Sequence, residues 1–314
     1  MKLTRWLKRA ALIAAAIPAA GFLYERLSAR RAKLGRLPFG DFVTVNGRRV
    51  YTLVQGQDQP GPTVVLLAGA GSLAVTWLSI MAFVRDFAPV LAYDRPGLGW
   101  SDPIPGSRRP HTIATELRQL LEASNVPKPY IVVGHSLGGL HALAFADLYP
   151  QDVTGLVLVD SSHPKMHLRR EIDWAAEQAG LKQMRRNARW GWWRARAGLP
   201  GGNFAVLPKT VRKALRDIGP SGAETIQREV HSIFSGLDLA HWPDVPTTVL
   251  TRTPASFPSS RAWQELQADF AKRFPRSKHL VLPDSGHGIP HDAPQEVITA
   301  IRELVESYRE AQGH

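Results

Sequence analysis

The stretch YIVVGHSLGGLHAL, residues 130–143, decides the fold of this 314-residue chain. Its apolar start predicts a buried strand, and the residues from Leu137 onward predict a helix. Between them, GHSLG at residues 134–138 has the pattern G-x-S-x-G. A serine there sits on a strained turn, and larger side chains two residues to either side would collide with the strand or the helix. The stretch therefore predicts a turn that exposes Ser136 Oγ at a helix N-terminus, which favours developing negative charge.

Apolar strands and helices alternate on both sides of this turn. The segment FVTVNGRRVYTLVQG, residues 42–56, predicts a hairpin with a type I′ turn at Asn46-Gly47. Buried strands that alternate with helices predict a mostly parallel sheet with helices on both faces. Further strands are expected at residues 63–69, 89–94, 155–160, 247–251 and 278–283, and helices near residues 77–87, 113–124, 137–149, 261–274 and 294–310.

The alternation stops between about residues 165 and 242. This region is helical in pattern, basic and rich in tryptophan, with RRNARWGWWRARAG at residues 185–198 as its most biased piece. An insertion of this kind after the sixth strand predicts a cap over the carboxyl ends of the strands, where open α/β sheets bind their ligands. We therefore expect a first core segment at residues 40–164, a helical cap at 165–243 and a second core segment at 244–314.

Residues 1–39 form a separate segment that is rich in basic and apolar residues. Basic residues flank the uncharged run Ala10–Tyr24, which has the length of a signal-peptide core and is short for a bilayer span of about 20 residues. The one clean A-x-A pattern, Ala14–Ala16, lies inside this run. We therefore expect an uncleaved membrane anchor that contacts lipid, with the catalytic domain on the extracytoplasmic side. A cleaved signal with a secreted or periplasmic product, or an amphipathic start of a soluble protein, are the alternatives.

The charge and cysteine counts limit the function classes. The formal net charge of +12 raises nucleic acid and anionic membranes as partners. Much of the excess lies in the N-terminal segment, and no nucleic-acid-binding motif accompanies it, so we expect no nucleic-acid partner. The chain has no cysteine, which excludes disulfides, thiol catalysis and cysteine-ligated metal.

Four sequence blocks are distinctive: LLAGAGS at residues 66–72, AYDRPGLGWSD at 92–102, GHSLGG at 134–139 and DSGHGIPHDAP at 284–294. Together they resemble the α/β-hydrolase superfamily, and the resemblance extends from about Val43 to Glu310. It implies the α/β-hydrolase fold, with a mostly parallel central sheet, helices on both faces and a helical cap after the sixth strand. The N-terminal segment adds a similarity to bacterial membrane-anchored members.

A serine nucleophile needs a general base, which is usually histidine. The resemblance places that base in the loop after the last strand, where this chain has His287. His135 is the variable residue of the elbow and is expected to point away from the reaction in a structural role. The remaining loop histidines lack comparable support: His111, His163 and His291.

The acid that orients the histidine departs from the commonest pattern of the superfamily, which has it after the seventh strand. Here TTVLTRTPASFPSSRAWQE, residues 247–265, has no Asp or Glu before Glu265, which is expected within a helix. Some members have the acid after the sixth strand, where Asp160 ends an apolar strand at the same sheet edge as the elbow. We therefore expect Asp160 to reach Nδ1 of His287.

Other interpretations of these carboxylates stay open. Asp160 would alternatively cap a turn together with Ser161 and Ser162, and the chain would then use another acid or none. Asp284, three residues before His287, is the rival acid, and Asp292 is a weaker one. Asp94 in the second block is expected to shape a loop, as the family uses that block.

Acyl transfer also needs donors for the oxyanion. The resemblance implies one backbone N–H from Leu137, which follows the nucleophile, and a second from the loop after the third strand. That loop usually reads His-Gly-x, whereas this chain has Ala68 in place of the histidine. The second donor is expected to be the amide of Ala70, because a backbone donor does not need the histidine side chain.

The resulting hypothesis is a serine hydrolase that cleaves carboxylic esters of a small acyl substrate through an acyl-enzyme on Ser136. No cofactor and no metal ion are expected. Superfamily members that act on haloalkanes or epoxides carry aspartate at the nucleophile position, so Ser136 argues against them. Amide or peptide cleavage by an amidase or aminopeptidase stays open. So does a non-catalytic, membrane-tethered binding protein on the same scaffold.

Overall fold

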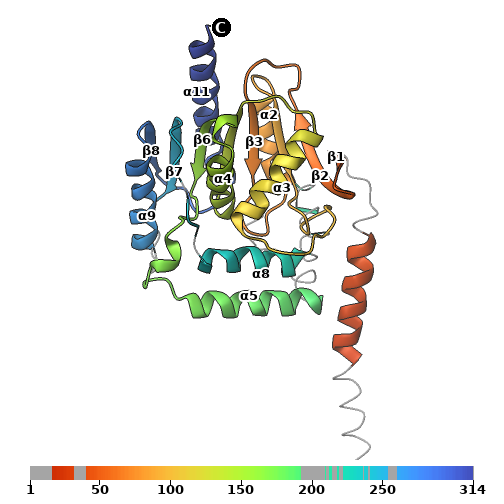
Figure 1. The fold of residues 1–314 in the computed structure, drawn as a ribbon. Coiled ribbons are helices and arrows are strands. Elements are labelled where there is room, and N and C mark those ends of the chain that lie inside the picture. Colours follow the sequence, from red (N-terminus) through yellow and green to blue (C-terminus); the bar gives the residue numbers. More distant parts are fainter. Residues whose placement is uncertain are drawn as a thin grey trace, which may run out of the picture.

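The computed structural model describes residues 16–31, 40–191, 222–235, 237–239, 241–253 and 260–313, together with Lys209, Arg212, Lys213 and Ile218. An eight-stranded sheet forms its centre, with helices on both faces (Figure 1). The strand order is β1-β2-β4-β3-β5-β6-β7-β8. The strands are β1 (Asp41–Val45), β2 (Arg48–Gln55), β3 (Thr63–Leu67), β4 (Val90–Tyr93), β5 (Tyr130–His135), β6 (Val153–Val159), β7 (Thr247–Arg252) and β8 (Ser277–Leu282).

Strand direction follows the sequence pattern. The hairpin strands β1 and β2 pair antiparallel, β2 pairs antiparallel with β4, and all pairs from β4 to β8 are parallel. The hairpin turn has positive φ at Asn46 (50°) and Gly47 (75°), as a type I′ turn requires. The central parallel strands are continuous apolar runs because helices cover both of their faces. The expected α/β-hydrolase fold, with a mostly parallel sheet, is confirmed.

Two apolar layers flank the sheet. On one face, α2 (Leu78–Val84) and α11 (Pro294–Gln312) contribute Ile80, Val84, Val297 and Ile301 to one core cluster. On the other face lie α3 (Pro110–Ala123), α4 (Leu137–Leu148) and α9 (Ser260–Arg273), and their buried side chains join a second cluster. The expected helix near residues 77–87 begins earlier, as a 3-10 helix at Ala74–Trp77, and α2 ends at Val84.

The insertion between β6 and β7 carries helices at one end of the sheet. A 3-10 helix, Met166–Leu168, is followed by α5 (Trp174–Arg189), α8 (Ala223–His231) and a second 3-10 helix, Ser232–Ser235. Figure 1 shows α5 and α8 lying across that end, with α8 next to the core. Residues 192–208 of the expected cap lie outside the described residues. The described helices thus lie over the edge at which the parallel strands end.

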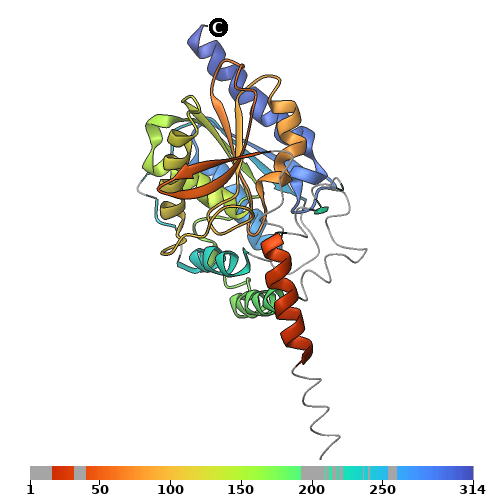
Figure 2. The same ribbon diagram turned by 90° about the vertical axis from the view of Figure 1, so that its right-hand side faces the viewer.

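A helix over residues 16–31 approaches the C-terminal end of α5 (Figure 2). The rings of Phe22 and Trp190 meet edge to face with centroids 6.2 Å apart, and the guanidinium of Arg189 lies 5.9 Å from the Phe22 ring. Within the described ranges, no helix has both the length and the apolar character needed to cross a membrane. The rest of the expected anchor, residues 1–15 and 32–39, lies outside those ranges.

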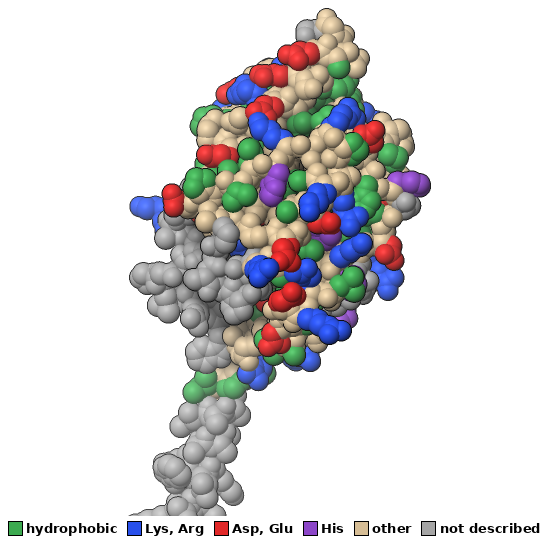
Figure 3. Space-filling view, turned by 90° about the vertical axis from the view of Figure 1, so that its left-hand side faces the viewer, with side chains coloured by type: hydrophobic (Ala, Val, Ile, Leu, Met, Phe, Trp, Pro, Cys, Tyr) green, Lys and Arg blue, Asp and Glu red, His purple; other side chains and the backbone are tan. Residues whose placement is uncertain are grey.

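Basic and acidic side chains alternate on the face of the molecule shown in Figure 3. On α9, Arg261 pairs with Glu265, and Arg273 pairs with Asp269. The Arg261–Glu265 pair is exposed, and exposed pairs contribute little to stability. On α9, Glu265 and Asp269 therefore neutralise the positive charges of Arg261 and Arg273.

A buried histidine links stability to pH. His163, 1% exposed, packs against Phe270 with ring centroids 4.5 Å apart and binds Asp269 Oδ2 through Nε2 at 3.0 Å. Its Nδ1 accepts the Lys165 amide at 3.1 Å, so Nε2 carries the proton of a neutral ring. Burial lowers the pKa of His163 from 6.5 to about 4. Above pH 6.5 the resulting stabilisation is fully present, and it is lost as pH falls toward 4, because only the unfolded chain then takes up the proton.

Replacing His163 by Gln, which keeps an amide donor and does not titrate, should flatten the loss of stability in acid. Urea denaturation at pH 7.0, 6.0 and 5.0 measures the free energy of unfolding. The slope against pH should fall by up to about one proton. It should not vanish, because burial also lowers the pKa values of His135 and His141. An identical slope in the variant and the wild-type chain would contradict the assignment.

Candidate active site

The turn at Ser136 joins β5 to α4 in a strained conformation. Ser136 has φ 52° and ψ −122°, outside the regions that L residues prefer. A Cβ on Gly134 would lie 2.6 Å from the Gly138 carbonyl oxygen, and one on Gly138 would lie 2.2 Å from the Leu67 carbonyl oxygen. Both glycines of the motif are therefore required by backbone packing. This geometry presents the serine hydroxyl at the N-terminus of α4.

His287 lies beside this hydroxyl. It belongs to the loop between β8 and α10 (Ile289–Asp292), and its Nε2 is 3.0 Å from Ser136 Oγ. The His287 side chain is 42% exposed, so a substrate can reach this edge of the ring. Proton transfer from the serine to Nε2 needs this distance.

Asp160 lies on the other side of the His287 ring. Its Oδ2 is 2.6 Å from Nδ1, and its side chain is fully buried. Asp160 directly follows β6, with φ 41°, and its amide donates to the Leu250 carbonyl at 2.7 Å. A positive φ is uncommon for a residue other than glycine and is tolerated best by Asp and Asn. The structure thus brings Ser136, His287 and Asp160 into one hydrogen-bonded chain.

Two residues that the sequence analysis did not single out hold the Asp160 carboxylate. The indole Nε1–H of Trp263 on α9 donates to Oδ1 at 2.8 Å. The amide of Arg252 donates to the same oxygen at 3.3 Å, and its guanidinium Nε lies 3.5 Å from Oδ2. Arg252 ends β7, the strand after which the commonest family pattern has the acid. The end of β7 therefore carries a cation facing the carboxylate on β6.

His135 also contacts His287. Its Nε2–H donates to the His287 carbonyl at 2.8 Å, and the two rings are 5.0 Å apart between centroids. Burial lowers the pKa of His135 to about 3, so the ring is neutral and keeps this donor. His135 therefore fixes the main chain of the loop that carries His287. The sequence offered no signal for this contact, because it joins residues 152 positions apart.

The rival carboxylates lie elsewhere. Asp292 Oδ2 accepts the Gly286 amide at 3.0 Å and so shapes the loop before His287. Asp284 lies in a turn with φ 61°. Buried Asp94 accepts the amides of Ala74 and Trp100, which matches its expected loop-shaping role, and burial raises its pKa to about 6.

In the described part of the chain, the other loop histidines do not contact the serine. His111 Nε2 lies 3.1 Å from Asp147, and His163 binds Asp269 as described above. Burial lowers the pKa of His291. None of the three makes a described hydrogen bond to Ser136.

The loop after β3 lies against the elbow. A Cβ on Gly69 would be 3.2 Å from Ser136 Cβ and from His135 Nδ1, so only glycine fits without a shift. Ala70 follows in this loop. Leu137 is the first residue of α4, where helix N–H groups have no intrahelical acceptor. The two amides expected to bind an oxyanion therefore belong to segments that flank Ser136.

Helix α8 of the insertion packs directly on these loops. Gly71 (φ 69°) would place a Cβ 2.9 Å from Ile226 Cδ1, and Gly97 (φ 86°) would place one 2.4 Å from Thr225 Oγ1. The loops after β3 and β4 are thus covered by one face of α8. Ile226 of α8 therefore lies next to Gly71, which follows Ala70 in the expected oxyanion loop.

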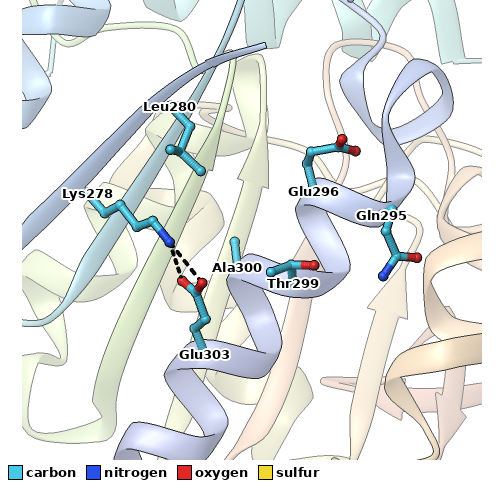
Figure 4. Close-up of a pocket in the computed structure, with 7 residues that line it drawn as sticks. All are labelled: Lys278, Leu280, Gln295, Glu296, Thr299, Ala300 and Glu303. Atoms are coloured by element: carbon cyan, nitrogen blue, oxygen red, sulfur yellow. Dashed lines mark hydrogen bonds and ion pairs between the residues drawn. The ribbon is translucent and has the colours of Figure 1, made fainter.

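A separate pocket lies between β8 and α11 (Figure 4). Lys278 and Glu303 form an ion pair across it, at 2.8 Å and 2.9 Å, and Leu280 and Thr299 also line it. None of the residues expected to act in catalysis contributes to it. Within the described ranges, no group of three or more His, Asp or Glu side chains is arranged to hold a metal ion.

Comparison with known proteins agrees with this architecture. Esterase Rv0045c of Mycobacterium tuberculosis is 30% identical over 78% of this chain and 83% of its own length. YqjL of Bacillus subtilis, described only as uncharacterized, is 27% identical over 83% of this chain and 90% of its own length. A thermophilic esterase from Thermogutta terrifontis superposes with a TM-score of 0.64 at 22% identity, covering 86% of this chain and 98% of that one.

The family model described as "Alpha/beta hydrolase family" matches residues 64–300. This match spans β3 to α11 and includes the elbow, the insertion and the His287 loop. The chain therefore belongs to the alpha/beta hydrolase family.

Proposed function

We propose that this hydrolase cleaves carboxylic esters through an acyl-enzyme on Ser136. The observation that carries the proposal is the hydrogen-bonded chain from Ser136 Oγ through His287 to buried Asp160, with distances of 3.0 Å and 2.6 Å. A serine, an imidazole and a carboxylate in this order activate a hydroxyl for acyl transfer. The 30% identity to an esterase over most of both chains favours an ester as the scissile group.

In the proposed mechanism, Ser136 Oγ attacks the acyl carbon while His287 Nε2 removes the hydroxyl proton. The resulting imidazolium is stabilised by Asp160, to which Nδ1 donates. The amides of Leu137 and Ala70 bind the oxyanion of the tetrahedral intermediate. His287 then returns the proton to the leaving alcohol. A water molecule, deprotonated by the same nitrogen, hydrolyses the acyl-enzyme and restores Ser136.

Arg252 and Trp263 have a supporting role in this scheme. A buried carboxylate is stable as an anion only when its oxygens are paired and hydrogen-bonded. The Trp263 indole and the Arg252 amide occupy Oδ1, which leaves Oδ2 for His287 and the guanidinium. The carboxylate is therefore held in the orientation that selects the Nδ1–H tautomer of His287.

Replacing Ser136 by Ala should abolish both labelling by a fluorophosphonate probe and hydrolysis of short p-nitrophenyl esters. The variant removes the attacking oxygen, and a loss of about 10⁶ in kcat is typical of such a change. Phe83→Ser, which alters an exposed residue (56% exposed) on α2, is the matched control and should keep both activities. An anilide of the same acyl group, assayed in parallel, tests the amidase alternative. Absent labelling and hydrolysis in the wild-type chain would remove the hydrolase proposal.

The identity of the acid is tested by replacing each of the two candidate carboxylates, Asp160 and Asp284, in a separate variant. Asp160→Asn keeps the shape of the side chain but cannot stabilise the imidazolium, so kcat should fall by about 10³–10⁴-fold. Asp284→Asn should change kcat by less than about threefold, since substitutions outside the hydrogen-bonded chain are usually mild. Circular dichroism must show that both variants are folded. The reverse ranking of the two variants would assign the acid to Asp284.

We also propose that the N-terminal segment attaches the enzyme to a lipid surface. The helix over residues 16–31 exposes four large apolar side chains, Ile17, Leu23, Tyr24 and Leu27, at 49–58%. Arg26, Arg30 and Arg31 add positive charge to the same helix. Apolar and basic side chains on one helix favour binding to anionic membranes. The extracytoplasmic location of the core stays a prediction.

Flotation with vesicles of phosphatidylglycerol and phosphatidylcholine tests this attachment. Leu23→Glu combined with Leu27→Glu should lower the vesicle-bound fraction several-fold, because charged residues oppose burial in the lipid interface. Phe83→Glu, at a similarly exposed apolar position on α2, should leave binding unchanged. Equal binding of all three proteins would show that these leucines do not contact lipid.

A further inference from the structure

A buried ion pair connects the insertion to the core. Arg95 follows β4, and its guanidinium meets the Glu229 carboxylate of α8 through three hydrogen bonds, Nε to both oxygens at 3.2 Å and 3.1 Å and Nη2 to Oε2 at 2.9 Å. The Arg95 side chain is 2% exposed and that of Glu229 is fully buried. Two residues 134 positions apart thus share a desolvated contact.

The same guanidinium also holds the loop after β3. Arg95 Nη1 donates to the Ala68 carbonyl at 2.6 Å, and Nη2 donates to the Gly69 carbonyl at 2.9 Å. These carbonyls belong to the two residues that precede Ala70, whose amide is a proposed oxyanion donor. A planar guanidinium fixes two adjacent carbonyls at once, which a lysine ammonium does not do. Arg95 therefore sets the path of the backbone that presents the Ala70 amide.

The Arg95 contacts hold the loop in the absence of the histidine that the family has there. The family pattern has a histidine at the position of Ala68, and its absence leaves the loop without that side chain. Ala68 has no polar side chain that could tie the loop to its surroundings. The Arg95 guanidinium supplies two hydrogen bonds at that point from a different strand.

Glu229 is in turn held by a second arginine. Arg108 Nη2 donates to Glu229 Oε1 at 3.2 Å, and Arg108 Nη1 binds both oxygens of Glu116 at 2.8 Å and 2.7 Å. Two carboxylates therefore balance two guanidinium groups inside the protein. Buried ion pairs often contribute no more stability than apolar residues of the same size, so a gain in stability does not by itself account for these pairs.

We propose that Arg95 and Glu229 form a latch that positions the oxyanion loop, residues 68–71, and that makes this loop depend on α8. Arg95 and Glu229 are positioning residues, because they act through the loop and contact no reacting atom. The inference rests on the proposed hydrolase function for its catalytic consequence. Its structural consequence, a loop ordered by the insertion, is independent of that function.

Arg95→Met is the main test, measured on the full chain with p-nitrophenyl butyrate. It removes both donors to the loop while keeping an unbranched side chain. Losing one oxyanion donor costs about 10²–10³ in kcat, so a fall of this order is expected with KM nearly unchanged. Affinity for a trifluoromethyl ketone, which forms an oxyanion when it adds to a serine, should fall in parallel. Arg95→Lys should recover only part of kcat, because one ammonium cannot serve both carbonyls and Glu229.

Hydrogen exchange gives a readout that needs no catalysis. In Arg95→Met and in Glu229→Gln, amides of residues 68–72 should exchange faster, whereas those of β3 (Thr63–Leu67) should keep their protection. Glu116→Gln is the matched control, since Glu116 binds Arg108 in the same buried cluster but has no hydrogen bond to Arg95. It should leave kcat and the exchange of residues 68–72 unchanged.

A double variant distinguishes the loss of the loop contacts from a general loss of stability. Arg95→Met with Glu229→Met replaces the buried pair by apolar side chains and is expected to fold. The latch predicts that kcat stays low, because the carbonyls of Ala68 and Gly69 are still unheld. Recovery of kcat in the double variant, or unchanged exchange of residues 68–72 in Arg95→Met, would overturn the latch. Faster exchange together with no ester hydrolysis by the wild-type chain would uphold the latch and remove the proposed function.

Discussion

The strained turn at Ser136 is the constraint on which the rest of the site depends. The Ser136 carbonyl accepts the Ser162 amide at 2.9 Å, and Ser161 Oγ donates to the Gly134 carbonyl at 2.8 Å. A Cβ on Gly139 would lie 2.2 Å from Ser161 Oγ, so α4 and the exit of β6 touch without a gap. Ser161 and Ser162 are therefore fixed by the elbow itself. Asp160, which directly precedes them, shares that fixed position.

The structure separates the role of Asp160 from that of the two serines that follow it. Ser161 and Ser162 bind carbonyls of the elbow, whereas the described contacts of the Asp160 carboxylate are with His287, Arg252 and Trp263 and not with the turn. Arg252 at the end of β7 supplies the positive charge that faces the buried carboxylate, and Trp263 on α9 donates a hydrogen bond to it. With Asp160 directly after β6, the neighbouring strand therefore carries its counter-ion.

The parts of the fold predicted from the sequence are those governed by local patterns. Period and composition located the strands of the sheet, Asn46-Gly47 located the hairpin, and the glycines around Ser136 located the elbow. The resemblance to the α/β-hydrolase superfamily named His287 in the loop after the last strand. The lack of a carboxylate after the seventh strand, together with the second acid position known in the superfamily, favoured Asp160. The helix expected near residues 77–87 is present as α2 (Leu78–Val84), but the sequence pattern did not reveal the 3-10 helix that precedes it.

The contacts that could not be predicted all join distant segments. The Arg95–Glu229 pair, the Arg252 and Trp263 contacts with Asp160 and the His135 bond to the His287 carbonyl each depend on how loops meet in three dimensions. No periodicity or spacing encodes such meetings, and each of these side chains also fits an ordinary exposed or core position. Together they hold the main chain of His287, the Asp160 carboxylate and the carbonyls of the oxyanion loop.

Proton NMR of His287 tests the central claim, that Asp160 is the partner of its Nδ1–H, most directly. A short hydrogen bond to a carboxylate moves such a proton downfield of the amide region. The account predicts a downfield resonance in the wild-type protein that disappears in His287→Gln and in Asp160→Ala and persists in Asp284→Ala. A resonance that survives Asp160→Ala and is lost in Asp284→Ala would contradict it.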